Sequence, residues 1–74
     1  TGRGVPQDSH AAYVLAKETA ELGHSTGQYL LGLVLVTGNG APQNYQEGVK
    51  WMQAAARKGH LEAQQVLREQ GLNW

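Results

Sequence analysis

An internal repeat limits the folds that this chain can adopt. Residues 1–8 (TGRGVPQD) return as residues 37–44 (TGNGAPQN), which sets the repeat length at 36 residues. Aligning residues 1–36 with residues 37–72 needs no gap and gives ten identities, where chance would give about three. Repetition at this period is typical of a solenoid of stacked helical or strand units. We therefore expect a single repeat domain over residues 1–74, with units at about 1–36 and 37–72.

Each unit carries signals for the start of a helix. Asp8 and Asn44 are good N-caps, because their side-chain oxygens can accept hydrogen bonds from amides of the first helical turn. Pro6 and Pro42 favour an extended conformation in the residue before them. We therefore expect the first helix of each unit to begin after its proline.

Glycines mark where these helices end. Gly23 and Gly59 can adopt the left-handed conformation that terminates a helix without a steric cost. A second helix should follow each of them, and no segment shows the alternation typical of strands and hairpins. The pattern predicts four helices, over about 9–22, 25–37, 44–58 and 61–70.

The predicted helices differ in how apolar side chains are distributed. The helix at 44–58 has one apolar stripe, which includes Val49 and Met52, whereas residues 29–36 are apolar nearly all round. A helix without a polar face normally lies between two others. Gly32 and Gly48 each cost about 1 kcal/mol relative to alanine inside a helix, so we expect them to allow a close approach of neighbouring helices.

Composition excludes several function classes. Six basic and six acidic residues cancel to a net charge of zero, so the chain lacks the basic surface of a nucleic-acid or anionic-membrane binder. The absence of cysteine rules out disulfides, thiolate zinc sites and a cysteine nucleophile. The longest apolar run, residues 33–36, is far too short to span a membrane. We therefore expect neither a nucleic-acid nor a membrane partner.

Residues that could carry chemistry do not cluster. His24 and His60 are one repeat apart, which separates them too widely to converge on a metal with His10, so we interpret both as turn residues. The glycine pairs at 2 and 4 and at 38 and 40 lack the lysine or the third glycine of phosphate-binding loops, so we interpret them as turns too. We expect no catalytic residue, no cofactor site and no metal site, and hence no enzyme.

The spacing of several residues resembles a known family. These residues are Leu31-Gly32, Gly38-x-Gly40, Pro42-Gln43-Asn44-Tyr45, Trp51, Ala55-Ala56, Gly59-His60 and Ala63-Gln64. The chain resembles the Sel-1-like repeat family, whose members are 36-residue relatives of the tetratricopeptide repeat. The resemblance implies an all-α, right-handed α/α solenoid of about two helical hairpins. It also implies a non-catalytic adaptor or scaffold that binds a partner protein or peptide on a preformed helical surface.

Some residues depart from the family pattern. In the first unit, Leu15 replaces the expected tryptophan, Thr19-Ala20 replaces an alanine pair, and Gly27 replaces an alanine in the helix that follows. Arg68 replaces a glycine and would obstruct a further stacked repeat. We therefore expect this chain to be the C-terminal end of a longer array.

Two apolar surfaces are candidate interaction sites. Tyr29, Leu30, Leu33 and Val36 lie on the helix that lines the concave side of such solenoids, and we expect a partner peptide or helix to bind there. The alternative, that Leu30 and Val36 pack against a neighbouring helix, stays open.

The second surface lies on the first helix. Ala12, Leu15, Ala16 and Thr19 would cover a preceding helix that this sequence lacks, and an exposed apolar patch favours self-association. We expect either a homodimer through this face or the remainder of a longer array to cover it. The alternative function is therefore that of a structural capping or self-association segment of a larger repeat protein.

Overall fold

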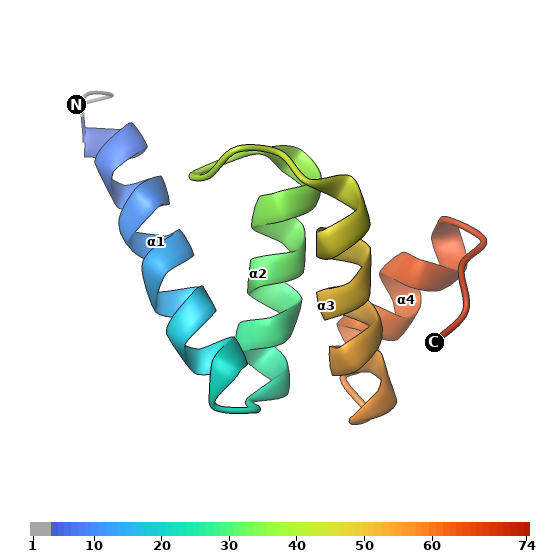
Figure 1. The fold of residues 1–74 in the computed structure, drawn as a ribbon. Coiled ribbons are helices and arrows are strands. Elements are labelled where there is room, and N and C mark those ends of the chain that lie inside the picture. Colours follow the sequence, from blue (N-terminus) through green and yellow to red (C-terminus); the bar gives the residue numbers. More distant parts are fainter. Residues whose placement is uncertain (1–3) are drawn as a thin grey trace.

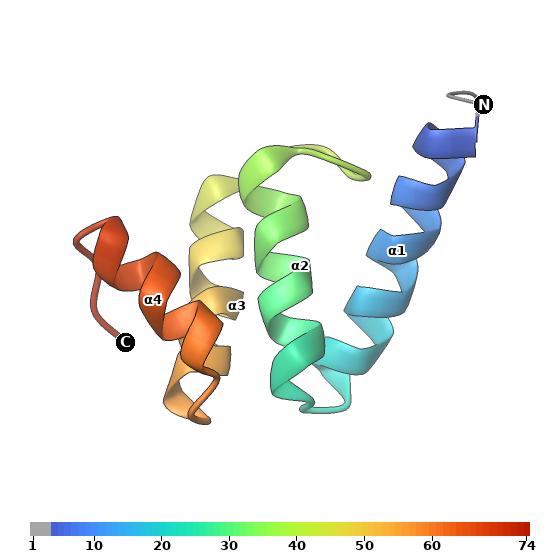
Figure 2. The same cartoon turned by 180° about the vertical axis from the view of Figure 1, so that it is seen from behind.

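The computed structural model describes the backbone of residues 4–74 and the side chains of residues 10–74. Over these residues the chain forms four helices: α1 (Gly4–Glu21), α2 (Ser25–Thr37), α3 (Tyr45–Arg57) and α4 (Leu61–Glu69). Successive helices run in opposite directions, and α2 lies between α1 and α3 in both views (Figures 1 and 2). The described residues include no strand, and the predicted all-α fold of helical hairpins is confirmed.

The start of α3 follows the predicted capping, and that of α1 does not. Asn44 is the N-cap of α3, and its Oδ1 accepts a hydrogen bond of 3.2 Å from the Glu47 amide. The prediction that the first helix begins after Pro6 is wrong, because α1 begins at Gly4 and includes both Pro6 and Asp8. Proline is tolerated in a first turn, where the amide it lacks would have no intrahelical partner. The predicted turn at glycines 2 and 4 lies partly outside the described residues.

The two glycine–histidine turns have the same geometry. Gly23 and Gly59 both have φ of 91°, in the left-handed region, as predicted. The His24 amide donates to Thr19 O at 3.1 Å and the Gly23 amide to Ala20 O at 3.0 Å, which is the Schellman arrangement. Equivalent bonds of 3.1 and 2.9 Å close the second turn, one repeat later. The two units therefore share the structure of this turn as well as its sequence.

The core consists of two clusters on either side of α2. The first joins α1 to α2 and comprises the buried residues Ala16, Ala20, Leu31 and Leu35. The second joins α3 to α4 and comprises Met52, Ala55, Ala56, Ala63 and Leu67. Tyr29 and Leu33 of α2 pack against the second cluster. Both flanks of α2 are therefore covered, which explains why its sequence is apolar nearly all round.

Two glycines bring the backbones of α2 and α3 together. A Cβ added at Gly32 would lie 2.9 Å from the carbonyl oxygen of Gly48. A Cβ added at Gly48 would lie 2.7 Å from Val36 Cγ2 and 2.9 Å from the carbonyl oxygen of Gly32. These distances are shorter than van der Waals contacts, so the predicted close approach is confirmed.

A second close approach joins α1 to α2 and accounts for two departures from the family pattern. A Cβ added at Gly27 would lie 2.3 Å from Thr19 Oγ1 and 2.7 Å from the Ala20 amide nitrogen. One repeat later the corresponding residues are Ala55 and Ala63, both 0% exposed. The threonine in α1 is therefore accommodated by a glycine in α2, because a larger and a smaller residue share the space that two alanines fill between α3 and α4.

Candidate partner-binding surface

An apolar pocket opens between α2 and α4, with α3 as its floor. Its volume is about 120 Å³. The residues that line it are nearly all apolar: Leu33, Val36, Tyr45, Val49, Met52, Val66, Leu67, Gln70 and Leu72. The helices supply most of this lining, and Gln70 and Leu72 follow the end of α4. The pocket can accept one or two apolar side chains of a partner, with Gln70 as a polar group at its edge.

Two of the predicted partner-binding residues line this pocket. Leu33 and Val36 lie one turn apart on α2, both half-buried. The close α2–α3 crossing fixes Val36, because its side chain and backbone lie directly over Gly48. The pocket therefore has a rigid wall on the α2 side.

The other two predicted residues lie elsewhere. Tyr29 is half-buried, and its ring stacks on His60 with centroids 4.7 Å apart and planes inclined by 26°. Leu30 is 45% exposed and faces α1, where it contributes to a separate groove with Ala12, Leu33, Val34 and Thr37. The four residues therefore do not form one patch, and of these four only Leu33 lines both the α2–α4 pocket and the groove of Leu30.

The predicted self-association residues line a groove between α1 and α2. Ala12 and Leu15 are exposed, Thr19 is half-buried beside Gly27, and Ala16 is only 3% exposed in the core cluster shared with α2. Ala16 therefore does not belong to an open face, because its small side chain lets α2 pack against this part of α1. Together with residues of α2 and its N-cap, the four residues line a groove of about 280 Å³.

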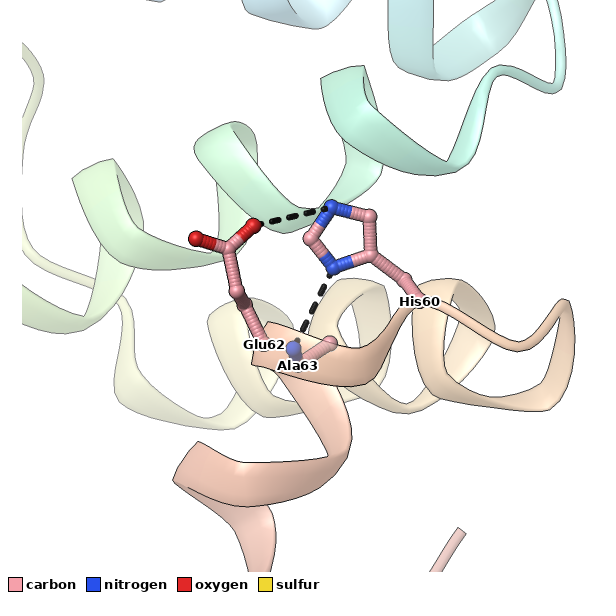
Figure 3. A network of polar contacts seen from close by, with 3 residues as sticks. All are labelled: His60, Glu62 and Ala63. Carbon is pink, nitrogen blue, oxygen red and sulfur yellow. Dashed lines mark hydrogen bonds and ion pairs between the residues drawn. The ribbon is translucent and has the colours of Figure 1, made fainter.

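His60, predicted only to be a turn residue, also stabilises the start of α4. It is the N-cap of α4, and its Nδ1 accepts a hydrogen bond of 3.2 Å from the Ala63 amide (Figure 3). Its Nε2 lies 3.7 Å from Glu62 Oε1. His24, the equivalent N-cap of α2, is exposed and its side chain makes no capping hydrogen bond. Over the described residues, no three His, Asp or Glu side chains lie close enough together to hold a metal ion.

The residues that α4 and the C-terminal segment contribute to the pocket were not predicted from the sequence. Leu72 packs against the second core cluster, and Val66 lines the pocket beside it. The repeat could have indicated both, since they are the counterparts of Val36 and Leu30. The last residues are held by a bond of 2.7 Å from Gln53 Nε2 to the Asn73 carbonyl oxygen.

The C-terminal segment also contacts Arg68. The guanidinium carbon of Arg68 lies 5.8 Å from the centre of the Trp74 ring, within the range of a cation–π contact. The arginine that replaces the family's glycine therefore has an aromatic partner in this chain. No helix among residues 4–74 combines the length and hydrophobicity needed to cross a membrane.

Comparison with known proteins agrees with this architecture. The Sel1 repeat matches residues 1–24 and 25–60, and the second match spans α2 and α3 with the turn that follows. No solved structure is significantly similar to the chain. Sel1 repeats are tetratricopeptide-like helical hairpins and generally serve as non-catalytic protein-interaction modules. Because the match covers most of the described helices, the chain belongs to the Sel1 repeat family.

Proposed function

We propose that the chain is a non-catalytic adaptor module that binds an apolar segment of a partner protein or peptide in the α2–α4 pocket. The observation that supports this proposal is the apolar lining of the pocket between α2 and α4, with α3 as its floor. A helix or peptide that inserts one or two aliphatic side chains would bury them against Leu33, Val36 and Val66. Burial of each such side chain stabilises the complex by about 1.5–3 kcal/mol before the costs of association.

A second function is supported by the C-terminal segment. Leu72 already packs against the core beneath this pocket, and Gln53 holds Asn73 beside α3. These contacts support the alternative in which the chain is a capping segment whose partner is the rest of a larger repeat protein. The two functions differ in whether the pocket binds a separate polypeptide.

The test is a peptide selection against the folded chain, followed by affinity measurements on variants. Val36→Ser removes an apolar group from the α2–α4 pocket. Leu30→Ser instead alters the groove that Leu30 lines with Ala12, Leu33, Val34 and Thr37. Leu61→Ser is a matched control, because Leu61 is 75% exposed and lines neither groove. Circular dichroism should show that all three variants stay folded.

The expected result is that selected peptides are rich in aliphatic residues and lose affinity about tenfold or more with Val36→Ser. Leu30→Ser and Leu61→Ser should leave the affinity unchanged. Peptides that bind all three variants equally would contradict the proposed site. Failure of Val36→Ser to fold would support the alternative that this residue is needed for the core.

A further inference from the structure

The loop between α2 and α3 contains a dipeptide that occurs once in the chain. Of the asparagines at positions 39, 44 and 73, only Asn39 precedes a glycine. Its counterpart one repeat earlier is Arg3, so the repeat does not require an asparagine at this position. An Asn–Gly pair in a turn has a distinct chemistry, because the glycine amide nitrogen can reach the carbonyl carbon of the asparagine side chain and no Cβ hinders its approach.

Hydrogen bonds hold both ends of this loop. At its start, the Gly38 amide donates to the Val34 carbonyl oxygen at 2.7 Å. At its end, the Asn44 amide donates to the Leu35 carbonyl oxygen at 2.8 Å. Between these two points the loop extends from α2 toward α1 before it returns to α3 (Figure 1). The ends of the loop are therefore fixed independently of the residues between them.

The middle of the loop carries the two groups that could react. Asn39 is exposed, and over residues 10–74 its side chain makes no hydrogen bond, although its amide donates to Thr37 Oγ1 at 3.3 Å. Within the same residues the Gly40 amide donates no hydrogen bond. Gly40 has φ of 109°, a conformation open mainly to glycine. No hydrogen bond of the described side chains therefore restrains the Gly40 nitrogen or the Asn39 carboxamide.

The other two asparagines are restrained. Asn44 Oδ1 accepts a hydrogen bond from the Glu47 amide, and its Nδ2 donates to Glu47 Oε1 at 3.4 Å. The residue that follows it, Tyr45, begins α3. The carbonyl oxygen of Asn73 accepts a bond of 2.7 Å from Gln53, and a tryptophan follows it. Both asparagines therefore serve as controls within the same molecule.

We propose that Asn39 is a site of spontaneous deamidation, with the Gly40 amide nitrogen as the nucleophile. A base in the solvent takes the proton from that nitrogen, which forms a bond to Asn39 Cγ. The bond between Cγ and Nδ2 then breaks, ammonia leaves with a proton from water, and a five-membered succinimide ring remains. Water opens the ring at either carbonyl and leaves aspartate or isoaspartate at position 39. No atom changes its oxidation state.

The product differs from the original chain in charge. A neutral carboxamide becomes a carboxylate, so the net charge changes from zero to minus one. Asn39 lines the groove that also includes Ala12, Leu30, Leu33, Val34 and Thr37. Deamidation therefore adds a negative charge to the lining of a largely apolar groove. Asn39 does not line the α2–α4 pocket, so this proposal does not depend on the proposed function.

The experiment incubates the folded chain in mildly alkaline buffer and follows it by anion-exchange chromatography and by peptide mapping with fragmentation. We expect a more acidic species to accumulate with first-order kinetics, with its mass change at position 39. Asn39→Gln and Gly40→Ala should each slow this conversion about tenfold or more. The first variant lengthens the side chain by one methylene, which disfavours ring closure, and the second places a Cβ beside the nucleophilic nitrogen. Because alanine is strained at a positive φ, circular dichroism checks that both variants stay folded.

The succinimide provides a second measurement that does not depend on a variant. In samples quenched with acid, a species with the mass of the chain less ammonia should precede the acidic product. Its absence would overturn the proposal even if Gly40→Ala failed to fold, because the carboxamide would then be hydrolysed by water directly.

Three further results would contradict the proposal. One is a folded chain that forms no acidic species while the chain unfolded in urea does, because the folded loop would then keep the two groups apart. Another is conversion of Asn44 or Asn73 at the rate of Asn39. The last is a folded Gly40→Ala variant that reacts as fast as the wild type.

Discussion

Replacing Gly48 with alanine should lower the free energy of unfolding, although alanine is the better helix former. At an exposed position of α3 the change from glycine to alanine would stabilise the protein by about 1 kcal/mol. At position 48 the added Cβ would lie 2.9 Å from the Gly32 carbonyl oxygen and 3.0 Å from the Val36 amide nitrogen. Both are backbone atoms, which no side-chain rotation can move away.

The magnitude follows from the difference between these two effects. Overpacking of a well-packed core costs about 1–3 kcal/mol, and a contact with backbone falls in the upper part of that range. Subtracting the propensity gain leaves a net loss of about 1–2 kcal/mol. For a domain of this size, 1 kcal/mol corresponds to about 4–8 °C in Tm.

The assay is thermal unfolding followed by circular dichroism. The matched control is the pair Lys50→Ala and Lys50→Gly, since Lys50 is exposed on the same helix and reports propensity alone. Gly48→Ala should melt below the wild-type protein even though Lys50→Ala melts above Lys50→Gly. A Gly48→Ala variant that is as stable as the wild type, or more so, would refute the close crossing of α2 and α3.

Two further predictions concern stability. Gly27→Ala should destabilise the chain, because the added Cβ would lie 2.3 Å from Thr19 Oγ1. Adding Thr19→Ala should recover part of the lost stability, and additive effects of the two substitutions in a double-mutant cycle would argue against a contact between residues 19 and 27. His60→Ala should cost about 1 kcal/mol through the lost cap on the Ala63 amide. His24→Ala should be nearly neutral, because its side chain makes no capping bond; equal losses for both variants in calorimetry would contradict this difference.

Helix ends were largely predictable because they depend on local chemistry. The side-chain cap of Asn44 and the turn at Gly23 consist of hydrogen bonds between residues at most five positions apart, so the identity of these residues is enough to place the helix ends. The start of α1 was not predictable in this way. Proline is compatible both with the residue before a helix and with its first turn, and Pro6 occupies the latter.

Contacts between helices were predictable only where a residue is unfavourable in its own helix and so indicates a close neighbour. A glycine inside a helix has a local cost, so Gly32 and Gly48 indicated a close crossing before their partners were known. The pairing of Thr19 with Gly27 had no such signal. Thr19 and Gly27 each depart from the family pattern, but only the contact between α1 and α2 shows that Gly27 makes room for Thr19.

Periodicity and local turn chemistry are enough to predict the repeat length, the helical hairpins and the central place of α2. The division of the apolar side chains of α2 between the α2–α4 pocket and the groove facing α1 depends instead on tertiary packing. Since residues 29–36 are apolar nearly all round, their periodicity contains no information about which side faces which neighbour. The packing of α1 and α3 sets that orientation, and it places Val36 in one groove and Leu30 in the other.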